Sequence, residues 1–181
     1  SFHYFFVYFI NSTYLEGVLD EKFVGYIYTA GAVLNITLFL MAPKILKRFG
    51  NYKLTLWLSI IELIALLGLA FIKTPGGIIF FFLTHEMVVP ILLYCMDIFL
   101  EEYSPTEAIG SIRGISLTML NLPPIITPFI AGIILIKPDY WKIYLISATF
   151  LVPFLAILIT YFRNYKDELY PAITIHDAVS K

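Results

Sequence analysis

Residues Leu54–Ile72 read LTLWLSIIELIALLGLAFI, and the class of fold follows from this apolar run. Of its 19 residues only Glu62 is charged. An α-helix needs about 20 predominantly apolar residues to cross the roughly 30 Å hydrocarbon layer of a bilayer. The stretch therefore predicts a membrane-spanning helix.

Comparable apolar runs flank this stretch on both sides, with short charged or turn-forming segments between them. The predicted spans, in chain order, are 2–15, 23–42, 54–72, 78–100, 114–136 and 143–162. Buried helices of a soluble protein mimic one or two such runs, but not six in sequence. We therefore expect an all-α membrane protein with six transmembrane helices over residues 1–162. The first run is short, which fits a truncated start, and residues 163–181 are expected to form a cytoplasmic tail or the start of a central linker.

Composition excludes several other classes of protein. The chain is 60% hydrophobic and 14% charged, against roughly 45–50% and about 25% in soluble domains. The sequence has no basic stripe with interleaved aromatic residues, so we do not expect nucleic acid as a partner. The single cysteine, Cys95, offers neither a disulfide nor a metal-binding pair. With no nucleophile–base pair and no Gly-rich phosphate loop, we expect no enzyme activity, no cofactor and no metal site.

The distribution of Lys and Arg predicts which loops face the cytoplasm, because basic residues gather in cytoplasmic loops. The loops after the second and fourth spans, together with the tail, hold eight of the twelve basic residues. The eight are Lys44, Lys47, Arg48, Lys53, Arg113, Arg163, Lys166 and Lys181. Both chain ends are therefore expected in the cytoplasm, with the protein in the plasma (inner) membrane.

The loop Pro43–Lys53 joins the second and third spans and carries a recognisable pattern. It resembles the signature loop of the major facilitator superfamily, which reads Gly, three residues, Asp-Arg, any residue, Gly, and then two mostly basic positions. Three residues match this pattern, namely Arg48, Gly50 and Lys53. Pro43 replaces the first Gly, and Lys47 replaces the Asp. Further segments are similar to several facilitator families, namely Asp97, Gly110–Gly114, Asn121 and Pro128–Gly132.

The resemblance implies an architecture and a function. Each six-helix half of such a transporter contains two three-helix repeats, and solute binds near the bilayer midplane. Helices one and four line the cavity, while helices three and six support them. A second six-helix half, in the same chain or in a dimer, is the expected partner beside the lipid bilayer and a small-molecule solute. The expected function is secondary active transport by alternating access.

The fourth span carries the best candidate for a functional carboxyl. Glu86, Tyr94 and Asp97 fall at i, i+8 and i+11, within one quarter of the helix circumference. Glu86 lies about eight residues, or roughly 12 Å, inside the span, where an ionisable group costs at least about 2.5–3.5 kcal/mol. We hypothesise that Glu86, helped by its neighbour His85, binds a cation or takes up the coupling proton. The alternative is a neutral carboxyl that hydrogen-bonds to a neighbouring helix.

Three further residues are candidates for contact with the solute. Tyr8 and Asn11 lie on one face of the first span, where an aromatic and an amide group suit an organic solute. Asn121 lies on the Pro128 face of the fifth span. Prolines in a membrane helix free backbone groups that need protein or cavity water, so Pro123, Pro124 and Pro128 predict a bent helix that faces the protein interior. Glu62, equally deep in the third span, is expected to make a structural contact with a partner that the sequence does not name.

The resemblance also suggests a cytoplasmic gate. In the family, the Asp of the signature loop pairs with groups at the inner end of a neighbouring helix. Here the charges are inverted, so Lys47 or Arg48 is expected to meet Asp97 or Glu101. Gly50 and Arg113 belong to the same predicted gate through the matched motifs. The alternative is that ordinary charges keep these loops in water.

A second class of function stays open at this point. A transporter-like protein that carries nothing and serves as a membrane receptor or assembly scaffold would have the same spans.

Overall fold

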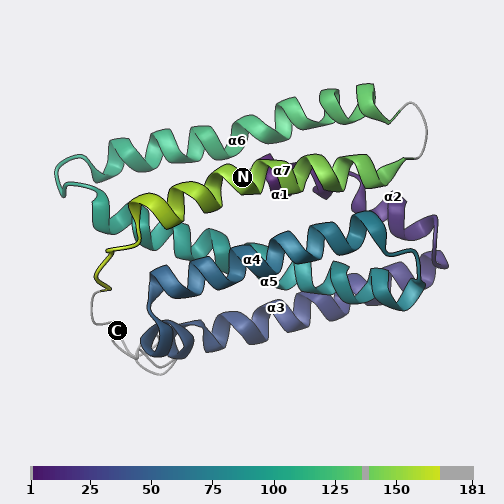
Figure 1. The fold of residues 1–181 in the computed structure, drawn as a ribbon, viewed down its shortest axis with the longest axis horizontal. Helices are drawn as coiled ribbons and strands as arrows, with labels where there is room; N and C mark the ends of the chain where they lie inside the picture. Colours follow the sequence, from purple (N-terminus) through teal and green to yellow (C-terminus); the bar gives the residue numbers. More distant parts are fainter. Residues whose placement is uncertain (1, 136–138, 168–181) are drawn as a thin grey trace.

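The computed structural model describes residues 2–135 and 139–167, and within these ranges it is all-helical with no strand. Five of its helices, α3 to α7, are long and apolar enough to cross a membrane, and they lie roughly parallel to one another in Figure 1. In chain order the helices are α1 (Phe2–Tyr8), α2 (Asn11–Glu16), α3 (Glu21–Phe49), α4 (Asn51–Phe71), α5 (Pro75–Tyr103), α6 (Ile109–Ile134) and α7 (Tyr140–Tyr161). This is the architecture of an all-α membrane protein, as the sequence predicts. The predicted separator residues 137–138 and the tail beyond residue 167 lie outside the described residues.

The first predicted span, residues 2–15, is divided into the two short helices α1 and α2. The interruption lies at Phe9 and Ile10, where the Ile10 amide donates to the Val7 carbonyl at 3.0 Å, three residues back. The start of α1 lies against the middle of α7, where the Ser147 hydroxyl donates to the His3 carbonyl. Neither α1 nor α2 alone has the length of a membrane span.

Helix α3 continues past Pro43, whereas the sequence analysis ended the second span at residue 42. The helix extends beyond the expected span because its buried face does not end there. Ala42 and Leu46, one turn apart, are both 2% exposed and pack in one cluster with Leu58 of α4 and Cys95 of α5. This burial carries the helix through most of the predicted loop, which contracts to a break at Gly50.

The packing order of the helices is regular. Helix α4 packs between α5 and α7; α5 also packs on α3, and α7 on α1, which in turn contacts α6. The minor contacts are α2 with α3, α3 with α4, α5 with α6 and α6 with α7. This set of neighbours is unchanged when the α1–α2 pair is exchanged with α5, α3 with α6, and α4 with α7.

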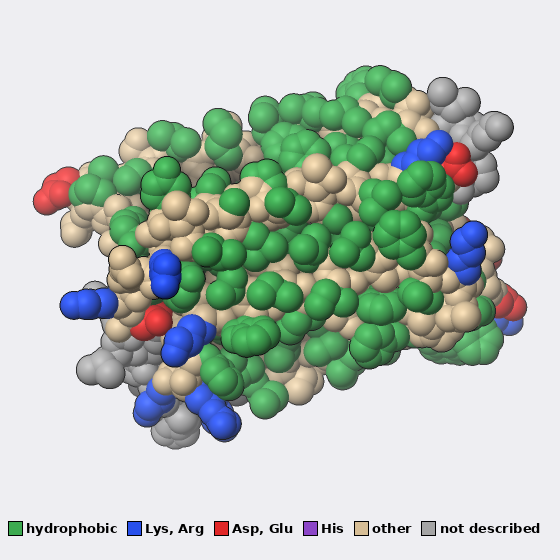
Figure 2. Space-filling view, in the orientation of Figure 1, with side chains coloured by type: hydrophobic (Ala, Val, Ile, Leu, Met, Phe, Trp, Pro, Cys, Tyr) green, Lys and Arg blue, Asp and Glu red, His purple; other side chains and the backbone are tan. Residues whose placement is uncertain are grey.

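The surface of the bundle is apolar along its length. Large side chains such as Phe129, Ile133 and Tyr161 are 76%, 73% and 78% exposed. On the face drawn in Figure 2, hydrophobic side chains cover the middle of the bundle, while charged side chains gather at its two ends. Such a band is costly in water and suits a hydrocarbon layer bounded by two polar interfaces.

Candidate solute-binding site

A cavity of about 310 Å³ opens where α2, α3 and α5 meet at the break between α1 and α2. Its lining residues are Tyr8, Phe9, Asn11, Ser12, Tyr28 and Glu86. The structure thus brings together three residues that the sequence analysis proposed separately, namely Tyr8, Asn11 and Glu86. The cavity lies well inside α5, because Glu86 follows Pro75 by eleven residues, or roughly 16 Å of helix.

Helices α3 and α5 lie close together at the level where Glu86 lines this cavity. A Cβ atom added to Gly31 of α3 would lie 3.6 Å from the Glu86 Cβ, so the two helices approach closely at this level. Glu86 is half-buried, and its carboxyl has no ion pair or hydrogen bond within residues 2–135 and 139–167. The carboxyl therefore faces the cavity without a partner from the described protein.

The side chain of Asn11 is oriented by a hydrogen bond from α7. It is 1% exposed, and the hydroxyl of Tyr144 in α7 donates to its Oδ1 atom at 2.9 Å. Tyr144 is itself completely buried. This bond orients the amide while no other hydrogen bond in the described structure engages its Nδ2 atom, which leaves a donor for a solute oxygen.

The hydrogen bond of His85 goes to Glu62 of α4 and not to its neighbour Glu86. Its Nδ1 atom lies 2.7 Å from Oε1 of Glu62 in α4, and both side chains are 0% exposed. The pair joins α4 to α5, and the Tyr4 ring stacks on the imidazole with centroids 6.1 Å apart. Glu62 thus makes the structural contact that the sequence predicted, and its partner is His85.

Two predicted site residues lie away from the cavity. Tyr94 lies further along α5, with its ring 6.1 Å from that of Phe39 in α3. Asn121 is exposed, and its amide donates to the Leu117 carbonyl of its own helix at 2.8 Å.

Of the three α6 prolines that were expected to face the protein interior, Pro123 is buried and Pro124 is partly buried. Pro128 is exposed, whereas Pro123, Thr127 and Ala131 are the buried residues of this helix. These three lie at i, i+4 and i+8, and the Thr127 hydroxyl donates to the Phe5 carbonyl of α1 at 3.3 Å. Both faces of α6 carry prolines or small residues, so composition alone does not distinguish them.

The predicted gate residues lie at one end of the bundle. Lys47 and Arg48 are exposed, and within the described ranges neither forms an ion pair with Asp97. Glu101 instead lies 3.4 Å from Arg113, in a pair whose side chains are 63% and 46% exposed. The inverted pair is absent from this conformation and stays a prediction.

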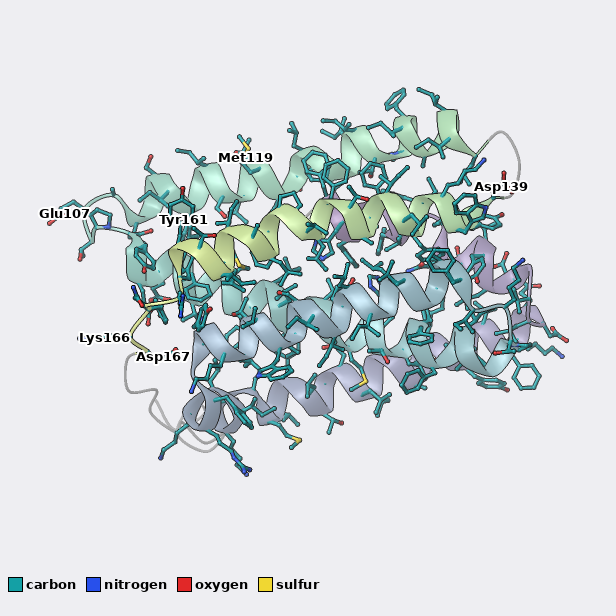
Figure 3. All side chains as sticks on the ribbon, in the orientation of Figure 1. Glu107, Met119, Asp139, Tyr161, Lys166 and Asp167 are labelled. Atoms are coloured by element: carbon teal, nitrogen blue, oxygen red, sulfur yellow. The ribbon has the colours of Figure 1, made fainter. Side chains whose placement is uncertain are left out.

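At this end of the bundle, contacts that were not predicted from the sequence join the start of α4 to α5 and to the segment after α7. The Asn51 side chain at the start of α4 donates to the Cys95 carbonyl of α5 at 3.0 Å. The Asn51 backbone amide donates to the carboxylate of Asp167, which follows α7. Gly50 has a φ of 77°, and a Cβ there would lie 2.1 Å from the Asp167 carboxylate. Gly50 therefore allows both the sharp turn and the approach of this acidic cap to the helix N-terminus. Figure 3 labels Asp167 at this end, with Lys166 and Glu107, and Asp139 at the opposite end.

Elsewhere in the described chain, neither a second hollow nor a metal site brings together the predicted functional residues. A larger hollow of about 520 Å³ lies near the loops, between the end of α4 and the start of α7, with Lys73 and Asp139 on its rim. In residues 2–135 and 139–167 no group of three His, Cys, Asp or Glu side chains is placed to hold a metal ion.

Two aromatic residues of the cavity were not predicted from the sequence. Phe9 and Tyr28 both line it. Tyr28 lies one turn before Gly31 and directly precedes the small-residue patch 29–32, whose small side chains permit close helix approach. That patch was the available signal.

The helices, the apolar band and the polar cavity define the class of this chain as an all-α membrane protein. Comparisons with known protein families, curated proteins and solved structures found no match to it.

Proposed function

We propose that this chain is one six-helix half of a secondary active transporter that moves a small solute by alternating access. The observation that carries this proposal is the unpaired Glu86 carboxyl, which faces a cavity of about 310 Å³ well inside the bundle. That volume is typical of small-molecule sites. A carboxyl is costly at such depth, so intramembrane carboxyls commonly mark ion or solute pathways.

The interrupted first helix supports the same function. Transporter sites are typically formed by discontinuous helices, because irregular backbone at membrane depth is tolerated where it lines a cavity. The break at Phe9 and Ile10 lies beside Glu86 and Asn11. We therefore count α1 and α2 together as the first of six spans.

The packing order supports two three-helix repeats. Suppose that α1–α2, α3 and α4 form one repeat and that α5, α6 and α7 form the other. Exchanging the two repeats then turns each principal helix–helix contact into another observed contact, or leaves it unchanged. In this arrangement the cavity lies between the first and fourth spans, which are the first helices of the two repeats. This agrees with what a facilitator-type half would show.

A second six-helix half would complete the transporter. Helices α3 and α6 are the least buried of the five long helices. The exposed Asn121 amide on α6 is costly against hydrocarbon and suits contact with protein or cavity water. We propose that the second half covers these faces, that both chain ends lie in the cytoplasm, and that the protein resides in the plasma (inner) membrane.

Uptake by the full-length gene product in proteoliposomes tests the function. A panel of labelled small solutes is supplied with and without a pH gradient. We expect accumulation of at least one solute, and at least a tenfold loss of its uptake in Glu86→Gln. Glu107→Gln is the matched control, because Glu107 is an exposed carboxyl in the loop between α5 and α6.

The result also separates the two classes of function. No uptake of any solute, with or without a gradient, would favour the receptor or scaffold. Unchanged uptake in Glu86→Gln would remove Glu86 from the mechanism.

A further inference from the structure

The cavity around Glu86 is lined by an acidic side chain and by no basic one. Its six lining residues include one carboxyl and no Lys, Arg or His. No Lys or Arg lies in α3 between Lys22 and Lys44, or in α5 at all. The nearest candidate for a positive charge, His85, is bonded to Glu62 and directed at α4. The cavity therefore lacks a counter-charge of its own.

The rest of the lining is aromatic. Tyr8 and Phe9 are 53% and 45% exposed, and Tyr28 lies across the cavity on α3. The Tyr4 ring, 5.4 Å from that of Tyr8, supports it from the α1 side. The faces of aromatic rings attract cations, and cages of such rings are the usual binding sites for quaternary ammonium groups.

Size and donor chemistry argue against a bare metal ion. A site for Ca²⁺ or Mg²⁺ gathers about six oxygen ligands around the ion at roughly 2.0–2.6 Å. Glu86 is the one charged ligand group among the residues that line this cavity, and the Asn11 oxygen already accepts a hydrogen bond from Tyr144. Its volume of about 310 Å³ suits an organic molecule instead. The Asn11 amide and the Ser12 hydroxyl add hydrogen-bonding groups for a polar tail of that molecule.

We propose that the cavity selects small organic cations, in which an ammonium group lies against Glu86 and the rings of Tyr8, Phe9 and Tyr28. This inference names the substrate class of the proposed transporter and rests on that function for transport, but not for binding. Charge neutralisation by the carboxylate supplies the preference for a cation, and the rings favour a bulky, weakly hydrated one. A neutral solute of the same shape leaves the Glu86 carboxylate uncompensated at depth.

Binding to the detergent-purified full-length protein tests the inference independently of transport. The probes are choline, its uncharged isostere in which carbon replaces the ammonium nitrogen, and the carboxylate that carries the same bulky hydrocarbon group. We expect choline to bind at least tenfold more tightly than the isostere, and the carboxylate to show no binding. Glu86→Gln should abolish the difference between choline and the isostere.

Two aromatic variants separate the cage from general damage. Tyr28→Leu should weaken choline binding at least fivefold. Tyr26→Leu should leave it unchanged, because Tyr26 lies two residues away on α3, does not line the cavity and is 69% exposed.

The outcomes distinguish this inference from the proposed function. Selective choline binding without uptake in proteoliposomes supports the cation site and contradicts transport. Uptake of neutral or anionic solutes, with choline bound no more tightly than its isostere, overturns the cation site and leaves transport standing. Equal weakening by Tyr28→Leu and Tyr26→Leu would overturn the aromatic cage.

Discussion

At the residue scale, the Glu62–His85 pair is the most demanding feature of the interior. Both side chains are fully buried, and one atom of each, Glu62 Oε2 and His85 Nε2, has no hydrogen-bond partner in the described structure. Buried polar pairs add little net stability but leave a costly orphan when one partner is removed. The pair is therefore expected to fix how α4 and α5 face each other.

Because the pair is fully buried, substitutions of Glu62 and His85 should lower the stability of the protein. Glu62→Leu and His85→Phe each leave the other polar group of the pair buried without its partner, and each alone should reduce the free energy of unfolding by about 1–3 kcal/mol. The double variant Glu62→Leu with His85→Phe removes both polar groups and should recover part of that loss. Unfolding in one detergent, measured for both single variants and the double variant, gives the coupling between the two residues.

Glu107→Ala serves as the control, since the loop carboxyl should not affect unfolding. A double variant as unstable as the sum of its singles would show that the two side chains act independently.

The same pair shows what the sequence could and could not predict about the site. Tyr8, Asn11 and Glu86 were identifiable because each is a polar or aromatic group deep in an apolar run. The partner of Glu62 was not identifiable, because spacing along one helix does not determine how the next helix is rotated. For the same reason Asn121 was assigned to the interior, although Thr127 occupies the buried face of α6.

At the scale of elements, the contact between α4 and α5 depends on a small residue. A Cβ atom added to Gly68 of α4 would lie 2.4 Å from the ring of Phe81 in α5. The ring therefore occupies the space above the glycine, and the helices pack closely at this point. Close approach at Gly is the usual basis of helix association in membranes.

We predict that Gly68→Ala destabilises the bundle by about 1–3 kcal/mol, as overpacking of a filled core does. Adding Phe81→Leu should restore much of the loss, because the smaller side chain vacates the space needed by the new methyl group. Thermal unfolding in detergent, followed by circular dichroism, measures both effects. Gly132→Ala is the matched control, since a Cβ there meets nothing within 4 Å; the absence of rescue by Phe81→Leu would contradict the steric explanation.

The elements themselves were largely predictable from apolar length. Each of the five long helices contains nearly all of a predicted span, because about 20 apolar residues have few alternatives to a helix in lipid. The errors arose where tertiary contacts override local signals. Pro43 suggested a helix end, but burial of Leu46 continues α3 beyond it. The break at Phe9 and Ile10 carries no Pro or Gly, and therefore no sequence signal marked it.

At the scale of the whole molecule, the helix order determines which loops share an end. The C-terminal ends of α3, α5 and α7 lie at one end of the bundle, and those of α2, α4 and α6 lie at the other. Of the described basic residues, seven lie at the first end and three, Lys22, Lys73 and Lys142, at the second. The described basic residues are therefore distributed unequally between the two ends of the bundle.

This asymmetry predicts the orientation of the protein in its membrane. The seven-residue end should face the cytoplasm, because Lys and Arg near the ends of spans resist translocation. Single cysteines at Lys44 and at Lys73, both exposed, report on the two ends. In intact cells a membrane-impermeant maleimide should label Lys73→Cys but not Lys44→Cys, and after permeabilisation it should label both. The native Cys95 is 0% exposed and should stay unlabelled, which the unsubstituted protein checks directly. The reverse labelling pattern would show the opposite orientation, and labelling of both positions in intact cells would mean that α4 does not cross the membrane.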